Sequence, residues 1–402
     1  MIGEENIINL IQKNSSKIIL VVMDGVGDLP DETGKTALDQ ASTPNLDKLA
    51  VNSALGLSIP ISPGITPGSG PSHLALFGYD PLKHQIGRGV LEALGIGMEL
   101  TCRDLAARAN FATRSPEGII TDRRAGRIAT EENIKICEKL NSALKPIDDV
   151  QVKVYPGKEH RFVVVFTAEG LNDNLLDADP ELDGKEEKLV EALDEDSYKA
   201  RDAANKFIKN VNNILKDDHP ANSCLLRGLA KSPSIKKFDE LYGLKACAIA
   251  SYPMYKGLSR LVGMDVIEGL TTNAEEVDKL KALYDDYDFF YLHVKKTDSY
   301  GEDGNRSSKA AVIEEFDALL PEVLALKPDV LCITADHSTP TSMKSHSWHP
   351  NPVLIKGPHI RKNEVAGFSE NECLKGVYGT FYSVDIMPIL MSQAGRLKKF
   401  GA

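Results

Sequence analysis

The chain has 402 residues, 42% of them hydrophobic, which is long for one layered core and predicts two domains. Its net charge of -11 excludes general affinity for the nucleic-acid backbone, although a local pocket can still bind a small anion. No apolar run reaches membrane-spanning length and no basic stretch precedes an apolar one at the N-terminus, so we expect a cytoplasmic protein with no membrane partner.

The six cysteines lack the paired spacing of zinc ribbons and redox motifs. Several fall inside apolar runs, which favours buried free thiols over disulfides. The residues concerned are Cys102, Cys137, Cys224, Cys247, Cys332 and Cys373.

The N-terminal part of the chain predicts a strand that ends in an acid and a helix that begins at a serine. A short helix over residues 7–14 precedes an apolar run, residues 17–22, which predicts a buried strand and leads into Asp24. Further on, a loop rich in proline and glycine places Ser69 and Ser72 at the start of an apolar helix. The N–H groups of a helix N-terminus suit a phosphoryl group, but a serine there is also an ordinary N-cap.

The middle of the chain has a different pattern. Residues 107–113 and 161–166 predict strands, residues 131–144 and 187–215 predict charge-laced helices, and residues 171–184 form an acidic loop. We therefore expect a domain with a parallel sheet, built from residues 1–95 and 236–402, that is interrupted by a smaller α+β domain of residues 96–235.

Two apolar runs in the C-terminal part also end in polar clusters. Residues 288–294 lead into Asp298, and residues 329–334 lead into Asp336 and His337, with His346 and His349 shortly after. Parallel strands present their carboxyl ends at one edge of a sheet, where ligands bind. A single Asp-His pair after a strand is also consistent with a helix cap and a surface histidine.

The number of acids near these strand ends favours a metal site over a helix cap with a surface histidine. Asp298 and Glu302 are four residues apart, which puts both carboxylates on one side of a helical turn. Unpaired acids so close together repel one another, and divalent cations reverse the sign of that energy. The sequence thus predicts a two-cation site, and such a site would activate the hydroxyl of Ser69 as a nucleophile.

Basic residues gather in the predicted α+β domain, above all in the Arg-Arg-x-x-Arg sequence on an apparent turn. The planar guanidinium group of arginine can bind carboxylates and phosphates through two hydrogen bonds, which would make this sequence an anion-binding site. The alternative is that these side chains only form a solvent-exposed basic surface. The candidate anion-binding residues are Arg123, Arg124, Arg127, His160, Arg227 and Lys256.

The order of five motifs resembles a known family over nearly the whole chain. Met-Asp-Gly, Pro-Gly-Ser-Gly-Pro-Ser-His-Leu, Thr-Asp-x-x-Gly, Thr-Ala-Asp-His-Ser and His-Ser-x-x-Pro resemble the cofactor-independent phosphoglycerate mutases of the archaeal type, in the alkaline phosphatase superfamily. The resemblance implies an α/β fold with a mostly parallel sheet flanked by helices and a smaller inserted α+β domain.

The resemblance also implies the metal ligands. One cation would be held by Asp24, Ser69, Asp336 and His337, and the other by Asp298, His346 and the residue four after Asp298. That residue is Glu302, where the better-known family pattern has histidine. Glutamate favours Mn²⁺ or Mg²⁺ over Zn²⁺. Asp303 and His349 remain alternative ligands at the second site.

The implied reaction is the interconversion of 3-phosphoglycerate and 2-phosphoglycerate in glycolysis and gluconeogenesis, without bisphosphoglycerate and through a phosphoserine at Ser69. Arginines of the inserted domain would clamp the glycerate carboxylate, and Asp122 and His160 are candidate acids or bases by residue type. The alternatives are a metal-dependent phosphomonoesterase, a mutase for another small phosphorylated metabolite, and a non-catalytic protein that has kept the fold. The sequence makes no prediction of the oligomeric state.

Overall fold

The computed structural model describes residues 4–361 and 364–401. The chain divides into unit 1, Met1–Gln85 with Ile235–Ala402, and unit 2, Ile86–Ser234. The first boundary lies earlier than the one expected after residue 95, because α5 (Arg88–Gly95) packs on strands β3 (Asp104–Arg114) and β10 (Ser223–Lys231) of unit 2. Gly89 makes this packing possible, since a Cβ atom there would lie only 2.2 Å from the carbonyl oxygen of Ala106.

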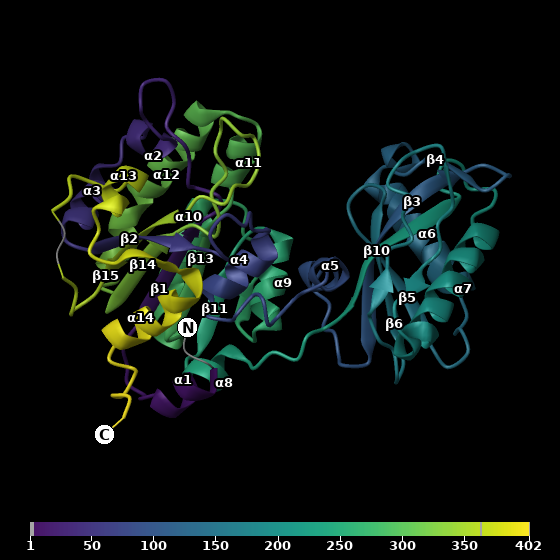
Figure 1. Ribbon diagram of the computed structural model, residues 1–402, viewed down its shortest axis with the longest axis horizontal. Coiled ribbons are helices and arrows are strands. Elements are labelled where there is room, and N and C mark those ends of the chain that lie inside the picture. Colours follow the sequence, from purple (N-terminus) through teal and green to yellow (C-terminus); the bar gives the residue numbers. More distant parts are fainter. Residues whose placement is uncertain (1–3, 362–363, 402) are drawn as a thin grey trace. The chain divides into compact units, whose positions relative to one another are not determined.

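Within the described residues, unit 1 is built on an eight-stranded sheet (Figure 1). Only β15 is antiparallel to its neighbours, and the other pairs are parallel. The order across the sheet is β12 (Asp265–Ile267), β11 (Ala246–Ile249), β13 (Phe289–Val294), β1 (Ile18–Met23), β14 (Val330–Thr334), β15 (Asn351–Lys356), β2 (Ala54–Ile59) and β16 (Gly379–Tyr382).

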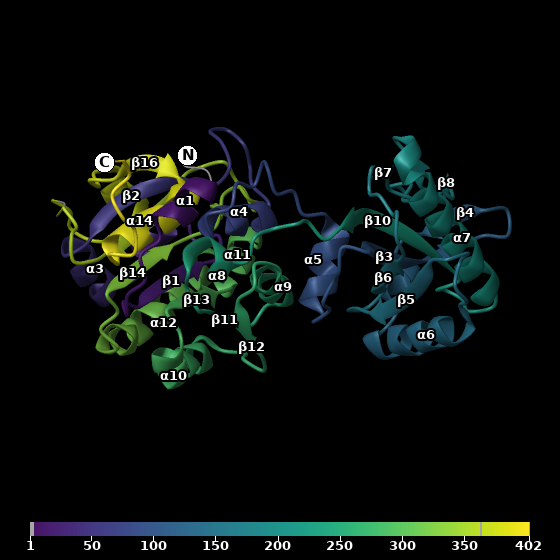
Figure 2. The same ribbon diagram turned by 90° about the horizontal axis from the view of Figure 1, so that it is seen from below.

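Helices cover both faces of this sheet, which is why β1, β13 and β14 are mostly apolar and every residue in them is buried. Figure 2 shows α10 and α12 on one side and α4 and α14 on the other. The first face packs against α2 (Ala37–Gln40), α3 (Pro44–Val51), α10 (Asn273–Leu283), α12 (Arg306–Ala325) and α13 (Glu370–Leu374). The other packs against α4 (Ser69–Leu76), α8 (Phe238–Tyr242), α9 (Pro253–Leu261) and α14 (Ile386–Gln393). The predicted α/β fold is confirmed.

Unit 2 has an antiparallel sheet with its core on one face. The strands are β5 (Gln151–Pro156), β6 (Arg161–Thr167), β3 (Asp104–Arg114), β4 (Ile119–Asp122) and β8 (Lys185–Glu186), with β10 (Ser223–Lys231) paired to β3. Helices α6 (Thr130–Ala143) and α7 (Tyr198–Ile214) bury that face. Short elements complete the chain: η1 (Ala125–Arg127), η3 (Tyr284–Asp286), α11 (Lys296–Glu302) and η4 (Ser383–Asp385).

Two predicted helices differ from the observed ones. The first, expected over residues 7–14, is α1 (Glu4–Leu10), because Ile11 and Gln12 pair with Leu397 and Arg396 instead of continuing the helix. The helix expected from residue 187 begins at Tyr198. Its expected first part forms β9 (Glu191–Ala192), which pairs with β7 (Leu175–Leu176), and η2 (Glu195–Ser197), which Asp194 caps.

All six cysteines are free thiols, and five are buried as expected, whereas Cys102 is exposed. Among the described helices, none combines the length and the apolar character that a membrane span requires.

Candidate metal and phosphoryl-transfer site

The predicted metal ligands meet at one edge of the unit 1 sheet. Strand β1 lies between β13 and β14, with Met23 paired to Val294 and Val22 to Thr334, so the residues after these strands lie close together. His346 comes from the segment before β15, and because β15 is antiparallel to β14, its beginning lies at the same edge. The topology thus gathers side chains from four separate parts of the chain.

The first cluster consists of Asp24, Asp336 and His337, whose ligand atoms all lie within 4.8 Å of one another. Nε2 of His337 is 3.4 Å from Oδ1 of Asp24 and 3.2 Å from Oδ2 of Asp336, and all three side chains are fully buried. These two carboxylate oxygens accept no hydrogen bond in the described part of the chain. Such oxygens are costly unless a cation satisfies them, so the residues present fit a metal ion.

The second cluster consists of Asp298, His337 and His346. Nε2 of His346 lies 3.5 Å from Oδ1 of Asp298, and the His346 ring stacks on that of His337 at a centroid distance of 3.6 Å. His337 therefore faces both clusters, whereas the family resemblance placed it with the first cation alone.

Glu302 lies at the edge of the second cluster. Its Oε1 is 3.9 Å from Nε2 of His346, and more than half of its side chain is exposed. Of the two alternatives, His349 contacts the hydroxyl of Ser347 and stacks on Trp348. Asp303 is exposed, and its backbone N–H donates to the carbonyl oxygens of Ser299 and Gly301 at the end of α11.

Burial and neighbouring charges shift the pKa values of Asp24, Asp336 and His337. Burial and the nearby Asp336 raise the pKa of Asp24 well above its usual range. Burial acts the same way on Asp336, but His337 and His73 outweigh it and hold the pKa of that carboxyl well below its usual range. Burial lowers the pKa of His337 to about 4, so this imidazole is neutral at pH 7 and its ring nitrogen can serve as a ligand.

Lys295 joins the two clusters and was missed in the sequence. Its Nζ lies 2.7 Å from Oδ2 of Asp24 and 2.8 Å from Oδ2 of Asp298. Its position in the sequence, between the apolar run of β13 and Asp298, could have identified it as a site residue. Tyr255 also reaches the site, because its hydroxyl donates to Oδ2 of Asp24 at 2.6 Å.

The two serines of the loop before α4 have different surroundings. Ser69 is the first residue of α4, half-buried, and its Oγ lies 3.4 Å from Nε2 of His337. Ser72 is buried, and its hydroxyl donates to the carbonyl oxygens of Gly68 and Ser69. His73 ties this helix to the first cluster, with Nδ1 2.9 Å from the Ser69 carbonyl oxygen and 3.3 Å from Oδ2 of Asp336.

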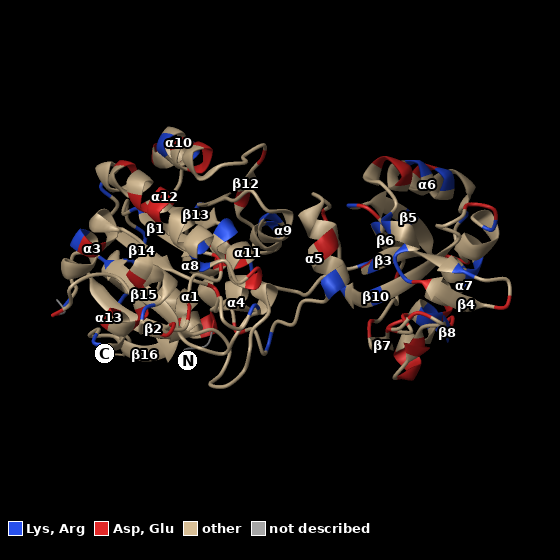
Figure 3. Ribbon diagram, turned by 90° about the horizontal axis from the view of Figure 1, so that it is seen from above, with Lys and Arg blue, Asp and Glu red and all other residues tan. Residues whose placement is uncertain are grey.

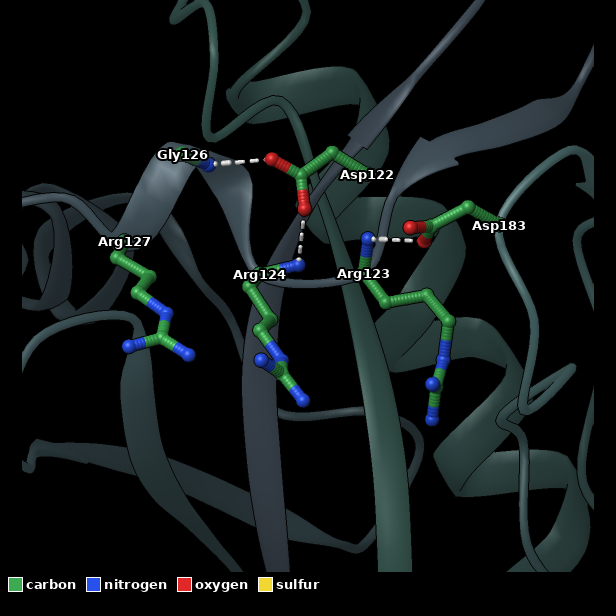
Figure 4. A pocket seen from close by; sticks show the side chains of 6 residues that line it. All are labelled: Asp122, Arg123, Arg124, Gly126, Arg127 and Asp183. Atoms are coloured by element: carbon green, nitrogen blue, oxygen red, sulfur yellow. Dashed lines mark hydrogen bonds between the residues drawn. The ribbon is translucent and has the colours of Figure 1, made fainter.

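Unit 2 contains a pocket of about 490 Å³ that is lined by Asp122, Arg123, Arg124, Gly126, Arg127 and Asp183 (Figure 4). Both oxygens of Asp122 accept backbone N–H groups, from Arg124 at 2.8 Å and from Gly126 at 2.6 Å. Asp122 thereby holds the backbone of this loop in place. Its two oxygens are engaged by these N–H groups, which does not favour the acid or base role suggested from the sequence.

The pocket loop has a strained backbone. Ala125, Gly126 and Arg127 all have left-handed φ angles, of 45°, 61° and 53°, which cost non-glycine residues roughly 1–3 kcal/mol each. The loop holds the side chains of Arg124 and Arg127 exposed, and Figure 4 shows the three arginines extending in the same direction. Strain of this kind clusters at ligand-binding sites.

The other predicted anion-binding residues lie in different settings. Arg123 forms two hydrogen bonds of 2.8 Å with the buried Asp179, whose Oδ2 is also 3.3 Å from Nε of Arg227. His160 is buried, and burial followed by the charge of Arg161 lowers its pKa, with smaller effects from Arg124 and Arg127. Lys256 belongs to unit 1 and pairs with Glu268 at 2.5 Å.

Two further residues of unit 2 were missed in the sequence. Arg108 lies opposite Arg227 across β3 and β10, and Asn110 lies opposite Arg161 across β3 and β6. Nε of Arg108 and Oδ1 of Asn110 are buried without a hydrogen bond in the described residues. Facing like charges destabilise a sheet unless acids neutralise them, and here Arg108 pairs with Glu92 at 3.2 Å and Arg227 with Asp179 at 3.3 Å. Figure 3 colours the lysine and arginine residues of unit 2 blue. The alternation of Arg108 and Asn110 with apolar residues was the signal in the sequence.

Comparison with known proteins identifies relatives over the whole length of the chain. The family model for 2,3-bisphosphoglycerate-independent phosphoglycerate mutase matches residues 50–222. A protein of Thermotoga neapolitana, described as a probable 2,3-bisphosphoglycerate-independent phosphoglycerate mutase, is 55% identical over 98% of both chains. A protein of Aquifex aeolicus with the same description is 53% identical, again over 98% of both chains.

Solved structures agree with this assignment. The cofactor-independent phosphoglycerate mutase of Thermoplasma acidophilum is 31% identical, with a TM-score of 0.77 over 94% of this chain and 100% of that one. A Pyrococcus horikoshii protein is 33% identical, with a TM-score of 0.82 over 97% of this chain and 100% of that one. This chain therefore belongs to an enzyme family, the 2,3-bisphosphoglycerate-independent phosphoglycerate mutases.

Proposed function

We propose that the chain interconverts 3-phosphoglycerate and 2-phosphoglycerate through a phosphoserine at Ser69. The observation that carries this proposal is the 3.4 Å approach of the Ser69 hydroxyl to His337, beside two buried acids, Asp24 and Asp336, that each keep one carboxylate oxygen without a hydrogen bond in the described residues. Ser69 begins a helix, and the N–H groups there suit the oxygens of a phosphoryl group.

Two divalent cations belong to this proposal. Asp24, Ser69, Asp336 and His337 would hold one, and Asp298, Glu302 and His346 would hold the other. When bound, the cations lower the pKa of the attacking hydroxyl and neutralise charge on the transferring phosphoryl group. The oxygen-rich ligands Asp24, Asp298, Glu302 and Asp336 favour Mn²⁺ or Mg²⁺ over Zn²⁺.

The proposed reaction consists of two phosphoryl transfers, first to Ser69 and then from it. Oγ of Ser69 attacks phosphorus, the bond from phosphorus to the glycerate oxygen breaks, and the proton lost by Ser69 ends on that oxygen. The glycerate stays bound and reorients. Its other hydroxyl then attacks the phosphoserine, its proton returns to Ser69, and the isomeric phosphoglycerate leaves.

The basic face of unit 2 would hold the glycerate carboxylate between these steps. Arg124 and Arg127 are the exposed members of the strained loop, while Asp179 already engages Arg123 and Arg227. We assign the direct contacts with the carboxylate to Arg124 and Arg127, and positioning roles to Arg123 and to the buried His160. Retention of the glycerate matters, because water in its place would make the enzyme a phosphatase.

The test is an enolase-coupled assay with 3-phosphoglycerate, without bisphosphoglycerate and with or without Mn²⁺. We expect turnover that depends on the metal, with little release of inorganic phosphate. Phosphate release without 2-phosphoglycerate would show a phosphomonoesterase, and inactivity towards phosphoglycerate with activity on another phosphorylated metabolite would show a different mutase. A cytoplasmic location is part of the proposal, since charged phosphoglycerates do not cross a bilayer unaided.

A further inference from the structure

Lys309 is a lysine of unit 1 with no exposed surface, near the start of α12. Its Nζ donates to three carbonyl oxygens, of Gly25 at 2.9 Å, Gly27 at 3.1 Å and Thr339 at 2.8 Å. An ammonium group has three N–H donors, so these bonds use all of them. Lys309 therefore has no donor for substrate or solvent, and its role must lie in the groups that it joins.

Those three carbonyls belong to the two segments that carry the first metal cluster. Gly25 and Gly27 follow Asp24, and Thr339 follows Asp336 and His337. The backbone N–H of Thr339 also donates to the carbonyls of Gly25 and Gly27, at 3.2 Å and 3.0 Å. The two segments thus meet through their backbones, and one ammonium group binds both.

The contact between the segments is close-packed. A Cβ atom on Gly25, whose φ is +57°, would lie 2.4 Å from Oγ1 of Thr339. A Cβ atom on Gly27 would lie 2.0 Å from Oγ of Ser338. This approach brings three carbonyl oxygens towards one point, where their dipoles repel unless a cation lies among them. Lys309 supplies that positive charge.

Thr339 extends the effect of this contact to the second cluster. Its hydroxyl donates to Oδ1 of Asp298 at 2.8 Å and lies 3.0 Å from Nδ1 of His337. A displacement of Thr339 would therefore move ligands of both cations. Among the described residues, Lys309 has no hydrogen bond or ion pair with a predicted ligand, and the acids Asp28, Glu370 and Asp298 favour its charged form from a greater distance.

We propose that Lys309 is a positioning residue that sets the distance between the Asp24 segment and the Asp336–Thr339 segment, and through it the affinity for the divalent cations. This inference rests on the proposed function in one respect, namely that the clusters bind such cations. Loss of a group that orients metal ligands typically weakens metal binding by about tenfold to a hundredfold.

The test is calorimetric titration of the metal-stripped protein with Mn²⁺, for the wild type and for Lys309→Met, which keeps the length of the side chain and removes its donors. We expect at least about tenfold weaker binding, with mutase turnover recovered when Mn²⁺ is saturating. Lys309→Gln, which keeps two N–H donors, should lie between the two and serves if the methionine variant does not fold.

Asp317→Asn is the matched control. Asp317 is also charged, buried and on α12, but it accepts from the backbone N–H of Leu46 at 2.7 Å. In the described part of the chain, it has no hydrogen bond with residues 24–27 or 336–339. Both substitutions should lower the melting temperature, and Asp317→Asn should leave Mn²⁺ affinity unchanged.

The outcomes separate the positioning role from the proposed function. Wild-type Mn²⁺ affinity in folded Lys309→Met, or equal weakening in Asp317→Asn, would overturn the positioning role. Weakened Mn²⁺ binding in an enzyme that does not convert phosphoglycerate would support the role of Lys309 and reject the proposed reaction. Failure of the wild type to bind Mn²⁺ would reject both.

Discussion

The hydroxyl of Ser69 lies 3.4 Å from Nε2 of His337, although 268 residues separate them in the chain. Thr339 determines the state of this imidazole. Because the Thr339 hydroxyl donates its proton to Asp298, Nδ1 of His337 must be the donor to Thr339, and Nε2 is then left with a lone pair. That lone pair faces Ser69, Asp24 and Asp336, where a metal ligand is required.

Replacement of the predicted nucleophile should abolish the reaction and leave the fold intact. Ser69→Ala removes the group that accepts the phosphoryl. The Ser69 hydroxyl is half-buried and lies 3.4 Å from Nε2 of His337, which is long for a hydrogen bond, so the melting temperature should change little. The coupled assay and thermal denaturation measure the two effects. Ser72→Ala is the comparison, because Ser72 bonds only to carbonyls of its own helix in the described structure. It should lose about 1 kcal/mol of stability and keep most activity. Substantial turnover by Ser69→Ala would move the assignment to Ser72.

Metal removal should abolish activity, and Mn²⁺ should restore it better than Zn²⁺, given the oxygen-rich ligands. Asp336→Asn removes a buried charge that no neighbour replaces, so Mn²⁺ affinity should fall by at least about tenfold. The assay after chelation measures whether activity depends on metal, and elemental analysis of the stripped protein shows that the metal has been removed. Full activity in protein shown to be metal-free would exclude the two-cation mechanism.

Binding of Mn²⁺ should strengthen with pH. Burial lowers the pKa of His346, but the bonds with Asp298 and the Pro67 carbonyl outweigh it and raise that pKa to about 9. The metal-free imidazole is thus protonated at pH 7 and must lose its proton to become a ligand. Affinity should rise by up to about tenfold per pH unit and level off above about pH 9. Titrations in buffers of different ionisation enthalpy measure the proton release, and binding without it would contradict the role of His346.

The stability of the metal-free protein should depend on pH in the opposite direction. A folded-state pKa of about 9, above the ordinary 6.5, means that His346 stabilises the fold fully below about pH 6.5. This contribution should fade as the pH rises through about 9, and denaturant titrations of the stripped protein measure it. His346→Gln should remove the dependence.

Replacement of the exposed arginines should separate mutase from phosphatase activity. Each lost charge-assisted contact costs roughly 1.5–3 kcal/mol, so Arg124→Ala with Arg127→Ala should lower mutase flux by at least about tenfold. Release of inorganic phosphate, measured on the same samples, should fall less or rise. Arg103→Ala is the control, since Arg103 pairs with Glu169 on an exposed surface of the same unit. Unchanged mutase and phosphate release in the double variant would place the clamp elsewhere.

The gathering of the three acids of the candidate metal site could be predicted from sequence because each acid follows a strand that is recognisable on its own. Asp24, Asp298 and Asp336 come after apolar runs, and parallel strands bring their carboxyl ends together whatever their separation along the chain. His346 was identified through its motif. Its approach from the start of the antiparallel β15 could not be read from the local pattern.

Other features could not be predicted because they depend on contacts made only in the folded chain. Lys309 lies 284 residues from Gly25, and in sequence it is one more charged residue near a helix start. The bidentate pairing of Arg123 with Asp179 likewise connects a turn to an acidic loop 56 residues away. The helix expected from residue 187 was too long because local periodicity does not show that β9 pairs with β7.

Trapping the phosphoenzyme tests the proposed reaction through Ser69 most directly. The Mn²⁺-loaded enzyme is mixed with 3-phosphoglycerate, quenched in acid within the first turnovers, and analysed by intact mass and peptide mapping. We expect one added phosphoryl group per chain, located on Ser69 and absent from Ser69→Ala. Mutase turnover with no phosphoryl group on the chain, or with one on a residue other than Ser69, would contradict the proposed reaction.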